Sequence, residues 1–594
     1  MAQLLLEDEF DSLEPGMFSA PVGAHTEYHY LPEAAPRGNW TVACFGSGRE
    51  GAGEAWHIQK ENGHHAMAQT FQNKRIDTHP TVIAGETYWE NYTLRVTFTP
   101  QEQRACCGVL FRYQNSRCNY FFGFNGPDLI LKMVHHGTAY RQPYEKILAQ
   151  QSCNRSPGET YTAQITVDGP HIRAEIEGLA TLEAEDTTYP TGKIGLQSDV
   201  PTVYHTVQVT ADAESIGQVN TLRSKKKREL EDLRAQNPKP VLWKKISTEG
   251  FGVGRNLRFG DLTGNGKNDV LIGQMHHHGP RDAYSELSCL TAMTFDGDIL
   301  WQIGTPDPEK YPLTNDVGFQ IHDIDGDGKN EVIYCQNFEI IVADGATGQF
   351  KYKAPTPKSK PPADKFPQIL GDCLFFCDLR GLGRAGDLLI KDRYWNFWIL
   401  NDKLELQWEH EIRTGHYPFA FDIDNDGHDE LAMGHAMFDH DGSLLWNLEN
   451  NIEDHVDGIA IANFQESEDS VPKILYAGSD SGIFFADLQG NVLKHHWIGH
   501  GQNPAIANLR PDLPGLEVVS INFWGNQGIL HFYDAHGDIY HSCEPNPFGS
   551  MCLPINWTGT GVEYFVHSPH ITHGGMFDGW GRPVVMFPDD GHPD

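Results

Sequence analysis

The chain has 594 residues, which is too long for one ordinary hydrophobic core, so two or more domains are expected. Hydrophobic residues make up 39% of the chain and aromatic residues 11%, which is typical of a folded, strand-rich protein and excludes a disordered one. The formal net charge of −35 excludes general binding of nucleic acid, because phosphate contacts need a basic surface.

Residues 1–213 contain short alternating segments separated by turn residues. The clearest expected strands span residues 92–98, 107–113, 120–124, 161–167, 171–176 and 192–198. Alternation of apolar and polar residues over such lengths is typical of antiparallel sheets with one buried face. We therefore expect an all-β sandwich over residues 1–213.

Residues 214–238 form a charged segment with a basic run at 223–228. Charge runs of this kind usually form a solvated surface, so a charged helical linker is expected here. An arm that docks onto a polyanion is the alternative interpretation.

Residues 239–594 repeat one strand pattern seven times. Each repeat has an inner strand, a second strand and a hairpin with Asp, Asn or Gly in its turn. A strand unit that recurs about every 40–60 residues is typical of a β-propeller. We predict a seven-bladed β-propeller, in which residues 240–246 could supply a strand to the last blade and close the ring. The inner strands are expected to start near Arg255, Val317, Gly371, His416, His455, His500 and Met551.

Three of the repeats carry an acidic loop with oxygen ligands at regular positions and a glycine at position 6. Calcium needs several oxygens around a tight turn, and glycine permits the turn. The run that follows each loop predicts a strand and not the exiting helix of an EF-hand. We expect these loops to bind Ca²⁺ with a structural role. A second role for Ca²⁺ at the functional site is left open. The alternative interpretation is that the loops are simple polar turns without a cation. The expected ligands are Asp261, Asn265 and Asp269 in the first loop, Asp323, Asp325, Asp327 and Glu331 in the second, and Asp422, Asp424, Asp426 and Glu430 in the third.

The face of a propeller opposite these loops collects histidines, cations, aromatic residues and amides. His416, His455 and His500 start successive blades and would converge on the axis, which favours a functional role over the structural role usual for a lone histidine. Aromatic rings stack on sugars, and Arg or Lys can hold a carboxylate, so this composition indicates a glycan site. The run 276–278, with His277 at its centre, could bind zinc, but a solvated loop or a substrate contact explains it as well.

The eleven cysteines indicate no disulfide framework and no zinc ribbon, because their number is odd and their spacings fit neither. Mostly reduced thiols are expected. The chain begins without a recognisable leader and contains no apolar run of membrane-spanning length. The expectation is a cytoplasmic protein, or a secreted one whose leader has been removed, with neither membrane nor nucleic acid as a partner.

Two resemblances sharpen this interpretation. The order of the motifs around Trp89, 108–113, 119–123 and 192–196 resembles the concanavalin-like jelly rolls attached to many glycan-active enzymes. The segment from Arg255 onward resembles the propeller-type polysaccharide lyases that act on rhamnose–uronate glycans, including rhamnogalacturonan lyases and L-rhamnose-α-1,4-D-glucuronate lyases. The phrases at 422–431 and 509–518 match most closely. Eight blades would be expected of a rhamnogalacturonan lyase, and seven are counted in this chain.

The resemblance implies β-elimination at a uronate in an acidic polysaccharide or oligosaccharide that contains rhamnose. By residue type, His416 or His455 would be the base and Tyr417 or Tyr394 the acid. Arg393 with Lys391 would neutralise the uronate carboxylate. The residues expected to line the sugar subsites are His277, His435, His500, Asn503 and Trp524. An α-L-rhamnosidase on the same scaffold and a non-catalytic glycan-binding protein are the alternatives.

Overall fold

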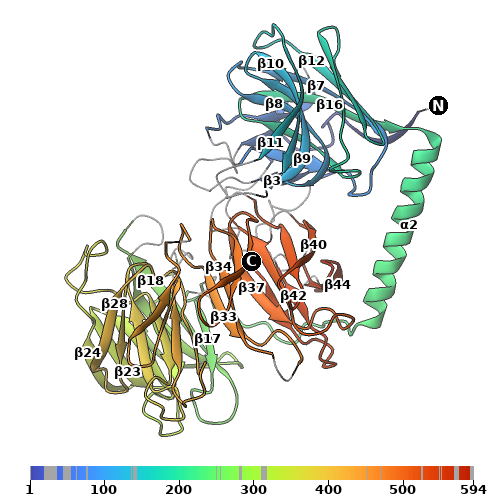
Figure 1. Cartoon of the computed structure of the whole chain (residues 1–594). Coiled ribbons are helices and arrows are strands. Elements are labelled where there is room, and N and C mark those ends of the chain that lie inside the picture. Colours follow the sequence, from blue (N-terminus) through green and yellow to red (C-terminus); the bar gives the residue numbers. More distant parts are fainter. Residues whose placement is uncertain are drawn as a thin grey trace. The chain divides into compact units, whose positions relative to one another are not determined.

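The structure, a computed structural model, is almost entirely built of β-strands, and the one helix among the described residues is α2 (Ala213–Gln236) (Figure 1). This confirms the all-β prediction. The described residues are 2–18, 37–44, 55–61, 63–74, 78–135, 137, 144–248, 250–253, 256–279, 284–308, 318–450, 452–467, 470–523, 526–546, 549, 551–567 and 574–588.

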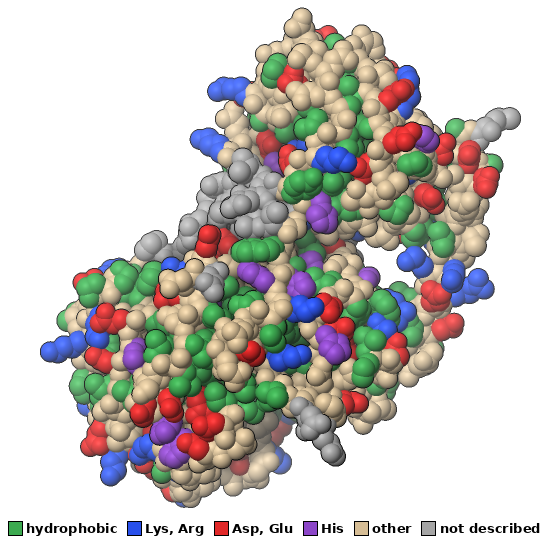
Figure 2. Space-filling model, viewed as in Figure 1, with side chains coloured by type: hydrophobic (Ala, Val, Ile, Leu, Met, Phe, Trp, Pro, Cys, Tyr) green, Lys and Arg blue, Asp and Glu red, His purple; other side chains and the backbone are tan. Residues whose placement is uncertain are grey.

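The chain divides into two compact units. The first contains Met1–Val241, Asp480–Gly482 and His496–Asp594, and the second contains Leu242–Ser479 and Ile483–His495. Within the described residues, no helix combines the length and the apolar character needed to cross a membrane. On the face drawn in Figure 2, Lys and Arg side chains lie scattered among Asp and Glu, in keeping with the acidic composition.

In the first unit, residues up to 211 form two antiparallel sheets with a shared core. The larger sheet has the order β14-β13-β12-β7-β16-β5-β4-β2, with β1 also paired to β16, and the smaller has the order β11-β10-β9-β8-β15-β6-β3. One apolar cluster draws on both sheets, and Trp56, Phe98 and Phe124 are fully buried in it. The strands are β1 (Gln3–Asp8), β2 (Gly16–Met17), β3 (Thr41–Cys44), β4 (Trp56–Glu61), β5 (His64–Gln69), β6 (Thr81–Ala84), β7 (Tyr92–Pro100), β8 (Cys106–Asn115), β9 (Cys118–Asn125), β10 (Asp128–His135), β11 (Glu145–Ser152), β12 (Tyr161–Asp168), β13 (His171–Ile176), β14 (Ala180–Glu185), β15 (Lys193–Ser198) and β16 (Thr202–Ala211).

Helix α2 is polar on nearly all sides. Asp212 caps it by accepting a hydrogen bond from the amide of Ser215, and Val219 is its one buried residue. Ion pairs one turn apart, such as Lys225–Glu229, lie along its exposed surface. Its last turn contacts the C-terminal part of the same unit, where Arg234 donates to the carbonyl of Pro583.

The rest of the chain forms seven four-stranded antiparallel sheets among the described residues, each with its strands in sequence order. They coincide with the seven predicted repeats, whereas their closure into one propeller stays a prediction. Residues 240–246, which were expected to add a strand, form none, and Trp243 is 77% exposed. The strands are β17 (Leu257–Gly260), β18 (Asp269–His277), β19 (Ser285–Thr294) and β20 (Ile299–Gly304); β21 (Phe319–His322), β22 (Glu331–Gln336), β23 (Glu339–Asp344) and β24 (Phe350–Pro355); β25 (Cys373–Cys377), β26 (Asp387–Lys391), β27 (Asn396–Leu400) and β28 (Leu406–Glu411); β29 (Phe419–Phe421), β30 (Glu430–Met433), β31 (Ala436–Phe438) and β32 (Leu444–Asn447); β33 (Gly458–Ala462), β34 (Lys473–Ala477), β35 (Ile483–Ala486) and β36 (Val492–His496); β37 (Gly501–Ala507), β38 (Glu517–Asn522), β39 (Leu530–Tyr533) and β40 (Ile539–Cys543); β41 (Leu553–Ile555), β42 (Tyr564–Val566), β43 (Met576–Phe577) and β44 (Pro583–Val585).

Tryptophans join neighbouring sheets of the second unit. Trp446 of β32 donates its indole N–H to the carbonyl of Leu488 (3.0 Å), and its ring lies over Gly490 in the hairpin turn of the next sheet. Trp408 of β28 packs in the same way on Gly442. Both glycines have a positive φ, +81° and +87°. The turn therefore needs glycine for its backbone conformation and for the space that the indole occupies.

Replacing Gly490 by alanine is expected to destabilise the fold more than an ordinary turn substitution does. The new Cβ would lie 2.6 Å from Trp446, which adds a packing penalty of about 1–3 kcal/mol to the strain of the positive φ. Gly383→Ala is the matched control, because Gly383 also has a positive φ (+69°) but no atom lies within 4 Å of its added Cβ. Equal losses of Tm for the two variants would contradict the packing role of Trp446.

Candidate functional site

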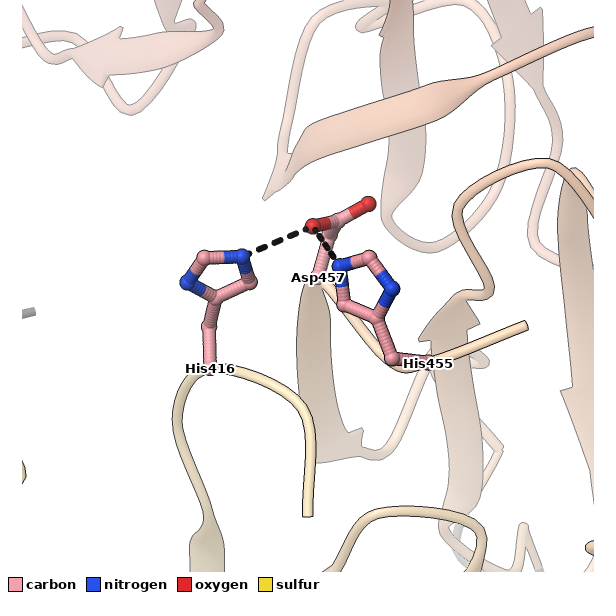
Figure 3. A group of neighbouring side chains, drawn as sticks. All are labelled: His416, His455 and Asp457. Atoms are coloured by element: carbon pink, nitrogen blue, oxygen red, sulfur yellow. Dashed lines mark ion pairs between the residues drawn. The ribbon is translucent and has the colours of Figure 1, made fainter. Parts of the chain in front are cut away.

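Three side chains of the second unit, His416, His455 and Asp457, form a compact histidine–aspartate cluster (Figure 3). Asp457 lies just before β33, and its side chain is 2% exposed. Its Oδ1 lies 3.2 Å from Nε2 of His416 and 3.3 Å from Nε2 of His455. Its Oδ2 accepts a hydrogen bond from the hydroxyl of Ser479. One buried carboxylate thus holds two imidazoles that come from different sheets.

Gly415 brings the two chain segments of the cluster together. The amide of His416 donates to the carbonyl of Val456 (2.9 Å), which places His416 beside the 454–457 loop. Gly415 has φ +67°, and a Cβ at this position would lie 2.1 Å from the carbonyl oxygen of Val456. Only glycine permits so close an approach of the backbones.

His455 carries a positive charge at neutral pH. Its Nδ1 lies 2.8 Å from Oδ1 of Asp454, and its Nε2 faces Asp457. Burial lowers the pKa of His455, but the Asp457 and Asp454 carboxylates outweigh burial and raise it from 6.5 to about 10. A ring with this pKa is a cation under working conditions, so His455 is a poor general base, and its two N–H groups face the carboxylates of Asp454 and Asp457.

The charge on His455 makes a testable contribution to stability. Because its pKa is about 10 in the fold and near 6.5 in the unfolded chain, protonation stabilises the fold fully below pH 6.5. This contribution is lost as the pH rises through about 10. The Tm difference between the wild type and His455→Gln should therefore be largest near pH 6 and shrink toward pH 10. Parallel Tm curves over this range would contradict the assignment.

Tyr394 and Arg393 lie beside the cluster. The ring centre of Tyr394 lies 4.7 Å from that of His455, and its hydroxyl lies 3.4 Å from Nε2 of His416. The guanidinium of Arg393 lies over the Tyr394 ring at 4.8 Å, and it is 3.8 Å from Oδ1 of Asp372. Four of the five residues predicted to be catalytic are thus gathered in one place. The fifth, Tyr417, is half-buried next to His416 in the chain.

Lys391 is fully buried and supports the loop that carries Arg393 and Tyr394. Its ammonium lies 3.0 Å from Oδ2 of Asp372 and donates to the carbonyls of Asp392 (3.2 Å) and Arg393 (2.9 Å). An ammonium has three N–H donors, and these contacts use all of them. Lys391 therefore fixes the loop and, in this conformation, keeps no donor for a substrate carboxylate.

Two of the histidines expected in sugar subsites have local partners within the second unit. His435 is 1% exposed and packs against Tyr476 and Phe484; burial lowers its pKa to about 4, so it is a neutral core residue. His277 ends β18, and its Nδ1 lies 2.8 Å from the hydroxyl of Ser285.

The remaining subsite candidates belong to the first unit. Nδ1 of His500 lies 2.6 Å from Oδ1 of Asp480. Asn503 is exposed at an irregularity of β37 and has a φ of +42°. Trp524 lies outside the described residues.

Sequence reasoning assigned no role to Asp457, Asp454 or Ser479, although the structure places them around the two imidazoles. The phrase Asp454-His455-Val-Asp457 was an available signal, because two carboxylates flank the histidine. Ser479 is 22 positions from Asp457 and carries no local signal.

The acidic loop at 323–331 contains an internal cation. Lys351 of β24 places its ammonium 2.6 Å from Oδ2 of Asp325 and 2.8 Å from Oε1 of Glu331. Burial lowers the pKa of Lys351, but these two carboxylates raise it well above its ordinary value. Of the two remaining carboxylates, Asp323 accepts hydrogen bonds from the amides of Gly326 and Gly328, and Asp327 accepts one from the amide of Lys329. A lysine thus neutralises the oxygens that a calcium ion would need.

The loop at 422–430 has the same backbone but lacks this lysine. Ala343 pairs with Phe350 in one sheet and Phe438 with Leu444 in the other, so Leu445 takes the place of Lys351. Oxygens of Asp422, Asp424 and Glu430 lie within 4.8 Å of one another, as do those of Asp323, Asp325 and Glu331 in the other loop. Burial, followed by the nearby carboxylates, raises the pKa of Glu430 to about 6. This donor set suits a hard divalent cation.

In two other loops, an arginine of the loop itself pairs with a loop carboxylate, as Lys351 does in the 323–331 loop. At 378–387, Arg380 takes the third loop position, and its guanidinium lies 2.6 Å from Oδ1 of Asp387. At 508–517, Arg510 takes the same position, and its guanidinium pairs with Asp512. The loop at 261–269 holds its carboxylates with backbone amides: Asp261 accepts from Gly266 and Asp269 from Leu262.

No protein-family model matches the chain, and no curated protein matches it. Among solved structures, it is similar to the rhamnogalacturonan lyase YesW, with 14% identity, and to the exotype rhamnogalacturonan lyase YesX, with 16% identity. In both cases the TM-score is 0.41, and the match covers 82% of this chain and 86% of the other. The carbohydrate-binding module CBM66 from Bacillus subtilis matches 29% of this chain over 96% of its own length, with 13% identity and a TM-score of 0.23. Similarities this distant assign no activity, so the function must be argued from the side chains.

Proposed function

We propose that this protein is a polysaccharide lyase that cleaves a rhamnose–uronic acid bond by β-elimination, on a seven-bladed propeller scaffold. One observation carries the proposal: Arg393, Tyr394, His416 and His455 lie together within the second unit, around the buried carboxylate of Asp457. They supply the cation, acid and base that elimination next to a carboxylate requires. The substrate class rests on the sequence resemblance of residues 255–594 to rhamnose–uronate lyases.

The carboxylate of the uronate is bound by Arg393 in this mechanism. The guanidinium of Arg393 neutralises it, which makes the proton on C5 more acidic. The two N–H groups of His455 face Asp454 and Asp457, and its raised pKa makes it a poor base, which leaves His416 as the base.

The elimination then needs one base and one acid. His416 removes the C5 proton, the electrons of the C5–H bond form the C4–C5 double bond, and the C4–O bond breaks. The hydroxyl of Tyr394 protonates the departing oxygen. Nε2 of His416 faces Asp457 and carries a proton, and it lies 3.4 Å from this hydroxyl, so that proton can pass to Tyr394 once Nδ1 of His416 has taken the C5 proton. The products are a new sugar hydroxyl and a 4,5-unsaturated uronate.

Contacts beyond the reacting bond are part of the proposal. His277 is proposed to contact a neighbouring sugar of an acidic glycan, and His500, Asn503 and Trp524 are proposed as sugar contacts of the first unit. Lys391 acts as a positioning residue for the loop, and His435 as part of the packed core.

Ultraviolet absorbance of the unsaturated uronate tests the activity directly. The protein would be incubated with rhamnogalacturonan, with arabinogalactan of the gum arabic type and with ulvan. A rise in absorbance on one of them supports the lyase and identifies its glycan. Free rhamnose without absorbance indicates a rhamnosidase, and binding without any product indicates a glycan-binding protein; either result would refute the proposal.

We also propose that the 422–430 loop binds one structural Ca²⁺ ion. Asp422, Asp424 and Glu430 would hold it, whereas in the 323–331 loop, whose three carboxylates are grouped in the same way, we propose that the ammonium of Lys351 takes the place of the metal. Calcium binds the folded state, so it should raise the Tm of the chelator-treated protein. We expect this rise to vanish in Leu445→Lys, which copies the lysine arrangement, and in Asp424→Asn. Asp325→Asn should keep it. An unchanged calcium response in Leu445→Lys would contradict the assignment of the site.

A further inference from the structure

The ligand atoms of the histidine–aspartate cluster are spaced like the ligands of one metal ion. Nε2 of His416 and Nε2 of His455 lie 3.2 and 3.3 Å from the same oxygen of Asp457, and all three atoms lie within 4.8 Å of one another. Ligands at about 2.1 Å from a tetrahedral or octahedral ion are neighbours at about 3.0–3.4 Å. The two measured edges fall in this range. Figure 3 shows the two rings turned toward the shared carboxylate from separate chain segments.

The hydrogen bonds around the cluster prepare it to bind a cation. Nδ1 of His455 faces the carboxylate of Asp454 at 2.8 Å, and a carboxylate requires a proton on that nitrogen. In the neutral ring, Nε2 is then an acceptor, and it lies 3.3 Å from Oδ1 of Asp457, which is also an acceptor, and 3.4 Å from the hydroxyl of Ser479. Two acceptors this close are stabilised by a positive centre, which either a proton or a metal ion can supply.

The hydrogen-bond partners of the proposed ligands are of the kinds that metal ligands usually have in proteins. A metal-bound histidine commonly donates its other ring N–H to a carboxylate, as His455 does to Asp454. A metal-bound carboxylate is commonly hydrogen-bonded at its second oxygen, as Asp457 is by Ser479. The side chains of His416 and His455 are 18% and 21% exposed, so an ion can reach them from solvent.

We propose that His416, His455 and Asp457 bind one divalent transition-metal ion of the zinc class, and that this ion inhibits the enzyme. Two imidazoles and one carboxylate favour zinc, cobalt or nickel, whereas the all-oxygen loop at 422–430 favours calcium. Inhibition follows because one nitrogen cannot hold a metal and a proton at once. A metal on Nε2 of His416 displaces the proton that this nitrogen passes to Tyr394 during elimination. Binding stands on the geometry alone, whereas inhibition rests on the lyase function proposed above.

Titration of the full chain with zinc chloride, in buffer with excess Ca²⁺, tests binding without reference to activity. Calorimetry should give one zinc site, and Co²⁺ should give visible absorption bands with the same stoichiometry. His416→Gln and His455→Gln should each weaken zinc binding at least tenfold. His276→Gln, which removes an exposed imidazole from the run 276–278, should leave it unchanged and serves as the matched control. Circular dichroism and Tm of each variant confirm folding before titration.

Zinc bound equally well by the wild type, His416→Gln and His455→Gln would overturn the site. Loss of binding in His276→Gln alone would also overturn it and place the ion in the 276–278 run. If a glycan is cleaved, one equivalent of zinc should stop the rise in absorbance, and chelation followed by calcium should restore it. Faster cleavage with zinc would overturn the inhibition. One-site binding that depends on His416, combined with no cleavage of any glycan, would uphold the metal site and refute the lyase.

Discussion

His416→Gln is expected to reduce kcat on the cleaved glycan between about 10² and 10⁴-fold, with a much smaller change in KM. The loss falls on kcat because the proposed base acts on the C5 proton only as the transition state forms. Glutamine keeps the size and a polar end of the side chain but cannot accept this proton. The measurement is steady-state kinetics by absorbance of the unsaturated product, together with the Tm of the variant.

His171→Gln is the control for the change of residue type, since His171 is an exposed residue of β13 and lies outside the proposed site. We expect its kcat to equal that of the wild type. If His416→Gln retains full activity while His455→Gln loses it, the roles of the two imidazoles must be exchanged. That outcome would also mean that the proton on His455 is held less firmly than its two carboxylates indicate.

Much of the strand pattern could be predicted from the sequence because burial on these sheets alternates or repeats in a regular way. The expected strand at 161–167 is β12, whose residues from Tyr161 to Val167 alternate between buried and half-buried. The seven repeats were visible because each hairpin turn needs Gly, Asp or Asn. For the segment 240–246 the same reasoning was wrong, because this segment has the composition of a strand but forms none in the structure.

The site could be predicted only in part, because residue type says little about what surrounds a side chain. His416 and His455 were identified as starts of successive blades, and they do meet. Their contact depends on Gly415 and on the buried Asp457, neither of which had been given a role. Lys391 was expected to face the substrate as a cation, yet its ammonium is satisfied by Asp372 and two carbonyls. Burial of this kind cannot be read from a chain without its partners.

The acidic loops show the same limit over a longer distance. Within the loop, residues 323–331 satisfy the calcium pattern as well as residues 422–430 do. The difference lies twenty positions later, where Lys351 stands in one sheet and Leu445 in the other. Only the pairing of the strands brings that position back to the loop. Local motifs therefore identify a possible cation site, and a neighbouring strand decides whether a lysine ammonium lies against its carboxylates.

Arg393→Ala is expected to lower kcat/KM about 10²–10³-fold while leaving Tm close to that of the wild type. Its guanidinium lies over Tyr394, and its ion-pair partner Asp372 keeps the ammonium of Lys391 at 3.0 Å when the guanidinium is removed. Arg393→Lys should recover part of the activity, because an ammonium restores the charge without the planar pair of donors.

A substrate whose uronate carboxyl is methyl-esterified separates the proposed role of Arg393 from a general structural one. If the guanidinium acts on the carboxylate, the wild type should lose most of its activity on the ester, and Arg393→Ala should lose little more. The two losses are then not additive, which is the sign of a direct interaction between the two groups. Equal further losses on the ester and on the free acid would mean that Arg393 acts elsewhere, for example by holding the ring of Tyr394 in place for its role as the acid.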